Sequence, residues 1–438
     1  MHKINTVIIG GGISGLSAGH FLNKKGVNFI LLESDNKIGG VIKTVNKNGF
    51  IFENGPNTIL NNNSSIDKLI NDHKLQNNII YPNLKSNSKR FLFFKDNPVA
   101  VPNNFWDFIK TPLLSIASKI RIFKEFFLKP HLNNTSVYNF ISRRFGKQFH
   151  DNLIEPFLTG IYAGDTRKMS AKHSLKRLWD LEQTYGSVIK GVIKSNKQNI
   201  KSINFSNGIS EIVNQLEKRL YNKIKVNQKV TKIKKTKSGY EIFIKEKKSF
   251  VCKNIISAIP AFELAKIIFD DDLKLKLNDL KYNPIDVFHF VFKKEDVKID
   301  LNGFGILTKP SDKKSFLGVL FNNKIFPHLC PKEYNLYTVM VGGEKQKDIL
   351  KLSNIELKTK ILNELRKLIK CKGKIYKTNY YSWKKGIPQY NKQQEEIEQA
   401  IFNFQEKNNS FRIIGNYYSG VSVSDCIQKA ELAALEIF

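Results

Sequence analysis

One stretch, residues 6–33, constrains the fold of this chain more than any other. An apolar run at residues 7–9 predicts a buried strand. The pattern Gly10-x-Gly12-x-x-Gly15 follows it, where the chain must turn tightly and begin a helix. A second apolar run at residues 27–32 predicts another strand, which ends at Glu33. Together these residues predict a βαβ unit of the kind that binds a dinucleotide.

Each position of the glycine pattern has a physical role in that interpretation. Gly10 makes the turn, Gly12 lets the backbone approach a pyrophosphate, and Gly15 lets the helix pack on the strand. The positive N-terminus of the helix then faces the phosphates, and Glu33 can accept a hydrogen bond from a ribose hydroxyl. No basic residue adjoins Glu33, which argues against a ribose 2′-phosphate. The ligand is therefore expected to be NAD or FAD.

A second pair of glycines favours FAD. Gly39-Gly40 follows Glu33 closely, and the chain then continues through strands expected at 41–45 and 50–53 to Gly55-Pro56-Asn57. NAD dehydrogenases rarely need a second glycine-lined approach at this place, whereas an extended FAD lying along the domain does.

The net charge of +32 invites a nucleic-acid interpretation, but the distribution of charge argues against it. Lysines are scattered over the whole chain among many Asn and Ile residues, which indicates a generally basic surface and no nucleic-acid partner. A basic surface still attracts anionic lipid headgroups and anionic substrates.

The cysteines and the apolar runs bear on the compartment. The four cysteines lie far apart without a Cys-x-x-Cys pair, so we expect no metal site, no redox motif and a reducing environment. No signal peptide precedes the first strand, and no apolar run is long enough to cross a bilayer. We expect a cytoplasmic protein, soluble or peripheral.

Residues 104–181 are expected to be mostly helical and contain a basic amphipathic segment. Its apolar face comprises Leu113, Ile116, Ala117, Ile120, Phe123 and Phe127, and its basic side comprises Lys119, Arg121 and Lys124. Such a segment can rest on a membrane surface, or it can be a helix packed on its own domain. The residues alone leave both interpretations open.

The remaining pattern predicts further elements in alternating groups. Helices are expected at 65–75, 209–220, 355–369 and from Ser424 or Asp425 to 437; strands are expected at 90–94, 99–101, 224–233, 240–244, 249–258 and 411–414. Alternation of apolar and polar residues over 286–341 predicts an antiparallel sheet. We expect the dinucleotide domain to be assembled from three separated pieces.

Several stretches resemble the FAD-dependent porphyrinogen oxidase family, a branch of the amine-oxidase-like flavoproteins. The N-terminal motifs VIIGGGISGLSAGHFL and FENGPNT are shared with the wider superfamily. Three others are more particular to the porphyrinogen branch: IEPFLTGIYAGDTRKMS at 154–170, WKKGIPQY at 383–390 and IIGNYYSGVSVSDCIQKAELAA at 413–434. The similarity spans nearly the whole chain in order.

The resemblance implies an α/β fold of three parts. A Rossmann-like FAD-binding domain would comprise residues 1–58, 203–262 and 408–438. A substrate-binding domain with an antiparallel sheet would comprise 59–94, 181–202 and 263–407, and residues 95–180 would form a helical, membrane-associating domain.

The resemblance also implies site residues. FAD contacts are expected at Gly10, Gly12, Ser14, Gly15, Glu33, Gly39, Gly40, Lys43, Gly55, Pro56, Asn57, Val230, Trp383, Gly415, Val421, Val423 and Ser424. Lys43 stands near a place where relatives often carry Arg. A helix beginning near Ser424 would direct its positive end at the flavin, where reduction deposits negative charge.

Substrate contacts follow from the same resemblance. Arg90 matches an arginine that holds a substrate propionate, and a guanidinium suits a carboxylate. Leu307, Leu320 and Met340 match apolar residues that clamp the macrocycle, although the third is commonly Phe. Asn57 lies beside the flavin and can form hydrogen bonds, but it cannot be a strong base.

The implied reaction is oxidation of protoporphyrinogen IX to protoporphyrin IX by hydride transfer to FAD, with oxygen as acceptor. Coproporphyrinogen III is an alternative substrate, as are amines or a polyene for a different flavin oxidase on the same scaffold. A peripheral membrane contact, a downstream ferrochelatase and a homodimer are implied partners. The remaining alternative is a non-enzymatic, basic membrane-surface binder.

Overall fold

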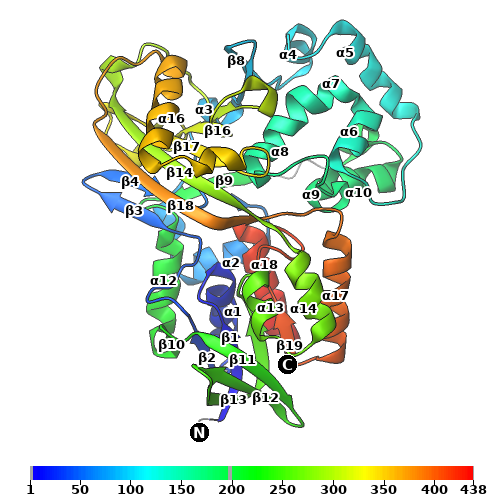
Figure 1. Ribbon diagram of the computed structural model, residues 1–438, viewed down its shortest axis with the longest axis vertical. Helices are drawn as coiled ribbons and strands as arrows, with labels where there is room; N and C mark the ends of the chain where they lie inside the picture. The colour runs from blue at the N-terminus through cyan, green and yellow to red at the C-terminus, as the bar shows by residue number, and fades with distance from the viewer. Residues whose placement is uncertain (1–2, 196–199, 438) are drawn as a thin grey trace.

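The computed structural model describes residues 3–195 and 200–437. The ends of the expected segments 1–58 and 408–438, and part of 181–202, therefore lie outside the described residues. Two large sheets lie one above the other along the long axis, and a group of helices stands beside the upper sheet (Figure 1). The fold is thus mixed α/β, as the sequence predicts.

The lower sheet contains the βαβ unit. Its strand order is β10 (Ile224–Lys225), β2 (Phe29–Leu32), β1 (Lys3–Ile9), β13 (Lys247–Ser257), β12 (Gly239–Ile244) and β11 (Val230–Thr236), and β19 (Phe411–Ile413) also pairs with β13. Strand β1 is parallel to β2 and to β13, with Val7 opposite Ile30 and Ile255. One sheet therefore draws on the start, the middle and the end of the chain.

Helices cover both faces of this sheet. On one face lie α1 (Ile13–Lys24), α2 (Ser64–Asp72), α12 (Ser210–Leu220) and α18 (Val423–Glu436), whose apolar side chains share a core with Ile8, Leu31 and Ile256. On the other lie α13 (Ala261–Ile267), α14 (Asp271–Asp279) and α17 (Gln394–Lys407). A sheet covered on both sides needs apolar residues throughout its central strands, as β2 shows.

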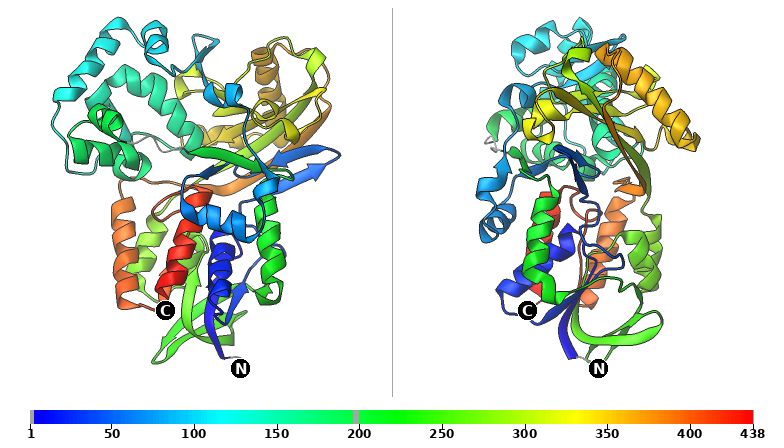
Figure 2. Two further views of the ribbon diagram at one scale, coloured as in Figure 1. Left: turned by 180° about the vertical axis from the view of Figure 1, so that it is seen from behind. Right: turned by 90° about the vertical axis from the view of Figure 1, so that its left-hand side faces the viewer.

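The upper sheet confirms the antiparallel pattern expected over 286–341. Its order is β18 (Lys377–Pro388), β14 (Tyr282–Lys293), β17 (Tyr334–Gly342), β16 (Gly318–Phe321), β15 (Gly305–Leu307), β7 (Phe91–Phe94) and β8 (Asn97–Ala100), with only β15 and β7 parallel. Helix α16 (Asn354–Ile369) covers one face, where Ile361 packs near Phe290 and Val339 (Figure 2). The opposite face is directed to the rest of the molecule.

Two small sheets connect the large ones. One pairs β3 (Thr44–Lys47) with β4 (Phe50–Glu53), and the other has the order β5 (Ile59–Asn61), β9 (Lys201–Phe205) and β6 (Ile79–Ile80). A short helix, α3 (Leu84–Ser88), precedes β7, and α15 (Asn322–Ile325) follows β16.

The helical group occupies residues 105–194. It comprises α4 (Phe105–Lys110), α5 (Ile116–Ile122), α6 (Val137–Phe145), α7 (Lys147–Phe149), α8 (Glu155–Tyr162), α9 (Ala171–Ser174), α10 (Lys176–Tyr185) and α11 (Val188–Lys194). Arg144 is fully buried at its centre between the equally buried carboxylates of Glu125 and Glu182. Buried charges are tolerated when paired in this way, so the three side chains fix how the helices meet.

The amphipathic segment is packed on the helical group through part of its length, since Ile122 contacts the core of that group and Arg121 bonds to the carbonyls of Ser142 and Arg143, but much of its apolar face stays exposed. Ile116, Ile120 and Phe127 expose 76%, 61% and 88% of their surface. Leu113 does not join them, because it is buried in the turn before α5. The helix also tightens to a 3₁₀ helix over Phe123–Phe127, which directs Glu125 inward to Arg144.

Three expected boundaries are wrong by a few residues. Helix α18 begins at Val423 and is capped by Ser422, whose hydroxyl accepts the N–H of Asp425. The strand expected at 224–233 is two strands, β10 and β11, on opposite edges of the sheet. Strand β3 begins at Thr44, after the tight approach of residues 41–42. Over the part of the chain that the structure describes, none of the helices has the length and apolar character to span a bilayer.

Candidate functional site

The glycine turn between β1 and α1 has no space for side chains. A Cβ at Gly15 would lie 1.9 Å from the carbonyl oxygen of Gly10, so only glycine permits this contact. The backbone N–H of Gly11 donates to Glu33 Oε2 at 2.6 Å, which fixes the carboxylate beside the turn. Helix α1 begins here with Gly12 as its cap, and no side chain occupies its N-terminus.

The second glycine pair lies directly against this turn. The N–H of Gly39 donates to the carbonyl of Gly11 at 2.8 Å, and a Cβ at Gly40 would lie 3.1 Å from Gly12 Cα. The carbonyl of Glu33 accepts the N–H of Gln228 at 2.7 Å, two residues before Val230. The structure therefore brings the predicted residues of the adenosine and pyrophosphate end together.

The segment Glu53–Asn57 begins at the end of β4 in the small sheet and is bound to the upper large sheet by side-chain hydrogen bonds. His289 donates to the carbonyl of Glu53 at 3.2 Å, and Trp383 donates to the carbonyl of Asn54 at 2.7 Å. Asn379 donates to Asn54 Oδ1 at 2.7 Å. We call these contacts the inter-sheet hydrogen bonds. They hold Gly55 and Pro56 between the sheets.

Asn57 is fixed at the end of the same segment. Its side-chain amide donates to the carbonyl of Gly55 at 3.2 Å, and its Oδ1 accepts from Asn322 at 3.2 Å. A side chain held from both ends can position a ligand but has no free basic group. The structure supports the expectation that Asn57 is no general base.

The C-terminal segment reaches the same region. Asn63 donates to the carbonyl of Ser424 at 3.2 Å, and the Ser424 hydroxyl bonds to the carbonyl of Leu60. The thiol of Cys426, one residue beyond Asp425, interacts with the Ser14 hydroxyl at the start of α1. Two helix N-termini, those of α1 and α18, thus lie side by side, as an extended diphosphate-linked ligand requires.

Three further expected contacts lie near the start of α18. Gly415 adopts a φ of +148°, which only glycine tolerates beside the ring of Tyr417. Val423 is buried in the core beneath α1, and Val421 packs on the core of the helical group. Val421 therefore links α18 to the motif at 154–170.

Lys43 points away from the glycine turn. Its ammonium donates to the hydroxyl of Tyr381 at 2.7 Å and lies 5.0 Å and 5.3 Å from the ring centroids of Tyr381 and Trp383. The structure thus puts Lys43 beside Trp383, another of the expected FAD contacts.

The face of the upper sheet opposite α16 carries the predicted clamp. Leu307, Leu320 and Met340 stand on three adjacent strands and are partly exposed, while their strand neighbours toward α16 are buried. Register places Leu307 opposite Gly318, and Gly318 opposite Met340, so the three share one face. The structure brings the predicted clamp residues together.

The motif at 154–170 has a structural explanation. Gly160 of α8 lies so close to Leu307 that an added Cβ would be 2.5 Å from Leu307 Cδ2. At the end of α8 the carbonyl of Ala163 accepts from the Asn283 side chain and from the N–H of Glu344, each at 2.8 Å. Helix α8 is therefore fixed to the upper sheet with its glycine against the clamp.

Arg90 lies at the far edge of that sheet, just before β7. Its guanidinium stacks 4.8 Å from the ring centroid of Phe304 and donates to the carbonyl of Asn87 at 2.9 Å. Burial lowers the pKa of Arg90, but a guanidinium remains charged at neutral pH. Within residues 3–195 and 200–437 no carboxylate pairs with it, so its charge is available to a ligand.

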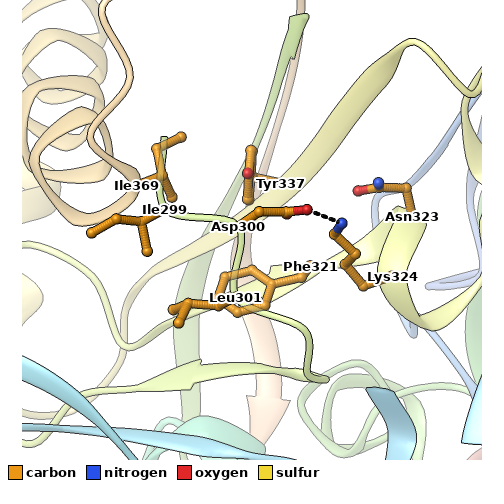
Figure 3. A pocket seen from close by; sticks show the side chains of 8 residues that line it. All are labelled: Ile299, Asp300, Leu301, Phe321, Asn323, Lys324, Tyr337 and Ile369. Carbon is orange, nitrogen blue, oxygen red and sulfur yellow. Dashed lines mark hydrogen bonds and ion pairs between the residues drawn. The ribbon is translucent and has the colours of Figure 1, made fainter. Parts of the chain in front are cut away.

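The recess on the other side of the upper sheet does not belong to this site. The recess in Figure 3 lies at the α16 side of the upper sheet, is too narrow for a water molecule, and is bordered by the Lys324–Asp300 ion pair at 2.5 Å. No cluster of three or more metal-ligating side chains occurs among the described residues.

Of the side chains that bond to the segment 53–57 from the upper sheet and α15, only Trp383 is expected from the sequence. For His289 a signal existed, because alternation in residues 287–292 puts it on the opposite face from Phe288 and Phe290. Asn322 and Asn379 gave no local signal, since only the tertiary fold brings them to the segment 53–57.

These residues fit a bound FAD. Gly10 and Gly15 have no space for a Cβ, the carboxylate of Glu33 is fixed beside the turn, and the N-termini of α1 and α18 lie together there. A sequence model described as flavin containing amine oxidoreductase matches residues 13–438, and the chain therefore belongs to this family. It is a flavin oxidoreductase with FAD as its cofactor, which confirms the class predicted from the motifs.

Particular relatives are similar over nearly their whole length. Protoporphyrinogen oxidase 2 of Arabidopsis thaliana is 28% identical, covering 99% of this chain and 94% of the relative. Coproporphyrinogen III oxidase of Bacillus subtilis is 27% identical, covering 98% and 97%. A crystal structure from Exiguobacterium sp. 255-15, assigned to the protoporphyrinogen oxidases, aligns with a TM-score of 0.85 at 20% identity, covering 100% of this chain and 99% of the other, which shows a shared fold.

Replacing Gly15 with alanine should abolish flavin retention. The added Cβ would collide with the Gly10 carbonyl and push α1 away from β1. The purified variant is expected to lack the flavin absorption band. Gly26→Ala is the matched control, because Gly26 has positive φ but nothing within 4 Å of a Cβ. It should cost about 1 kcal/mol of stability and retain FAD. A yellow Gly15→Ala protein would contradict the close-contact argument.

Two buried groups on either side of the inter-sheet hydrogen bonds titrate in opposite directions. Burial raises the pKa of Glu53 to about 7, against hydrogen bonds from Thr44 and the N–H of Ile209. Burial lowers the pKa of His289 to about 4. Glu53 therefore contributes stability that is present below pH 4.5 and is lost as pH rises through about 7. His289 contributes stability that is present above pH 6.5 and is lost as pH falls through about 4.

Single variants should separate the two contributions. Glu53→Gln should make the free energy of unfolding fall more steeply on acidification from about pH 6.5 to 4.5, by up to about 1.4 kcal/mol per pH unit. His289→Gln should flatten or reverse that fall over the same range. Urea unfolding at a series of pH values measures both. Profiles parallel to that of the unmodified protein would contradict the assignment.

Proposed function

We propose that this chain oxidises protoporphyrinogen IX to protoporphyrin IX, with oxygen as the final acceptor. The names of its relatives, among them protoporphyrinogen and coproporphyrinogen III oxidases, support a porphyrinogen as substrate. Coproporphyrinogen III is the second candidate, because relatives of both names align over nearly the full chain. Transfer of the product to a ferrochelatase and a homodimeric state are parts of the same proposal.

One observation carries the proposal: an apolar sheet face that stays partly exposed inside a folded molecule. Leu307, Leu320 and Met340 are partly exposed, whereas their immediate neighbours on the strands are buried. Gly160 of α8 lies against Leu307. Partly exposed apolar side chains presented together, with Leu320 also packed on the core around Phe50 and Phe52, fit a flat hydrophobic ligand. Met340 can contact the ligand without ring stacking, and its flexible side chain can adapt to the shape of the ligand.

The chain's own residues would bind the substrate and determine its orientation. FAD supplies the hydride acceptor when bound. Arg90 would hold a propionate at the far edge of the sheet, while Trp383 lies on the strand at the opposite edge. A macrocycle held at Arg90 would lie over Leu307, with Leu320 and Met340 on the next two strands. Proton release falls to solvent or to the substrate, because Asn57 is held from both ends.

Membrane contact is the second part of the proposal. A surface that we call the apolar rim comprises the exposed side chains of Phe105, Trp106, Ile109, Ile116, Ile120, Phe123, Phe127 and Leu132. Lys119 links α5 to α4 through the carbonyls of Ile109 and Thr111, so the rim is continuous across both helices. Basic residues border it, as at interfacial helices on anionic lipid. The protein would then be peripheral on the cytoplasmic face of a membrane.

Anaerobic addition of protoporphyrinogen IX should bleach the flavin of the purified holoenzyme. Arg90→Ala should raise KM about ten- to hundredfold, since a charge-assisted hydrogen bond contributes about 1.5–3 kcal/mol, and should leave FAD content unchanged. Arg167→Ala is the matched control, because Arg167 also stacks on a ring, 4.0 Å from that of Tyr138, but lies in the helical group.

The same experiment separates the alternatives. Bleaching by an amine or a polyene, and not by any porphyrinogen, would contradict the proposed reaction. An unchanged KM in Arg90→Ala would contradict the anchoring role alone.

Replacing Ile116, Ile120 and Phe123 together with serine should weaken binding to vesicles containing anionic lipid by at least about tenfold. The control is the triple serine variant of Phe402, Leu432 and Leu435, which are each 50% exposed on α17 and α18. Co-sedimentation with vesicles measures the difference. Equal loss of binding in both variants would sink the assignment to the apolar rim.

A further inference from the structure

Two cations without carboxylate partners lie at opposite ends of the clamp. Arg90 precedes β7, and Lys309 follows β15 by two residues. Neither forms an ion pair with any residue that the structure describes. Lys314 differs in this respect, because its ammonium lies 3.8 Å from a carboxylate oxygen of Asp96.

The register of the strands gives the spacing of the two cations. Strands β7 and β15 are parallel, with Leu92 opposite Leu307. Arg90 is therefore two residues before this level and Lys309 two residues after it. Four residues of extended chain span about 13 Å, and adjacent strands are about 4.8 Å apart. The cations thus flank Leu307 along the strand direction, with its side chain between them.

Lys309 is on the clamp side of the sheet. Its backbone is extended, so it shares a face with Leu307 two residues earlier. Its ammonium donates to Asn152 Oδ1 at 2.6 Å and lies 5.7 Å from the ring centroid of Phe94. Asn152 immediately precedes the helix whose Gly160 contacts Leu307. One stretch of the helical group therefore meets both Lys309 and the clamp.

The two groups that the Lys309 ammonium contacts are neutral, and the only nearby carboxylate among the described residues that interacts with its charge is that of Asp312, with which it forms no ion pair. Asn152 and Phe94 are neutral, and the nearby Asp312 carboxylate accepts the backbone N–H of Lys309 at 2.8 Å while its ammonium bonds elsewhere. A half-buried ammonium held by one amide oxygen can exchange that oxygen for a ligand carboxylate at little cost. The geometry differs from an ordinary surface lysine, whose charge is solvated.

We propose that Lys309 is a second carboxylate anchor that determines the acceptance of coproporphyrinogen III at this site. The inference rests on the proposed porphyrinogen oxidation. Protoporphyrinogen carries two propionates, which Arg90 can hold at one edge. Coproporphyrinogen carries four, so a macrocycle held at Arg90 presents carboxylates at its other edge as well. Lys309 meets these and extends the substrate range from dicarboxylates to tetracarboxylates.

The test compares Lys309→Met with Lys314→Met in the holoenzyme. Lys314 is the matched control, because it stacks on Phe93, which alternates with Phe94 to the opposite face of β7. Anaerobic flavin bleaching gives KM for coproporphyrinogen III and protoporphyrinogen IX, and fluorescence quenching gives the affinity for coproporphyrin III and protoporphyrin IX. Lys309→Met should raise the KM for coproporphyrinogen III and lower the affinity for coproporphyrin III about tenfold. The KM for protoporphyrinogen IX and the affinity for protoporphyrin IX should change less than about twofold.

The remaining outcomes separate the two proposals. Lys309→Arg should restore the KM for coproporphyrinogen III, and Lys314→Met should leave the KM for both substrates unchanged. If the ratio of the KM values for coproporphyrinogen III and protoporphyrinogen IX is the same in Lys309→Met as in the unmodified enzyme, the proposed role of Lys309 is overturned. If Lys309→Met fails to retain FAD, the comparison of Lys309→Arg with Lys309→Gln decides in the same way. Absence of bleaching by either porphyrinogen in the unmodified enzyme overturns the proposed function itself.

Discussion

The inter-sheet hydrogen bonds are the interaction on which the rest of the structure depends. Side chains of the upper sheet donate to the backbone carbonyls of Glu53 and Asn54, which continue directly from the small sheet of β3 and β4. Backbone carbonyls cannot move independently of the chain, so these bonds fix the segment that follows β4 against the upper sheet. If FAD and substrate bind as proposed, their reacting atoms must come within bonding distance beside this segment.

Local chemistry explains which parts of this arrangement the sequence could predict. The glycine turn, its two strands and Glu33 are read correctly because contact without side chains leaves a signature at fixed spacing. The antiparallel sheet follows from alternation. Leu307, Leu320 and Met340 carry no such signature, since alternation predicts only that they share a face, and the resemblance to relatives was needed to select them.

The features that the sequence did not reveal have a common physical cause, which is tertiary contact between distant segments. The ammonium of Lys43 donates to the hydroxyl of Tyr381, 338 positions along the chain, and no sequence spacing indicates that partner. Leu113 fits a helical face by spacing, but a turn precedes the helix and buries it. In both cases sequence spacing is correct locally and the partner is determined elsewhere.

The carbonyl of Ala163 has a mechanical consequence. It accepts two hydrogen bonds from the upper sheet, and the preceding carbonyl of Tyr162 accepts a third from Gln389. Lys345 adds ion pairs to Glu155 and Asp165 at the two ends of the same helix. The helical group and the upper sheet are therefore joined as one rigid body along α8. A bulky, flat product cannot leave by parting these two, and widening the space toward the lower sheet would strain the bonds that hold the segment 53–57. Release of the product and retention of the cofactor would therefore both depend on the hydrogen bonds of the segment 53–57.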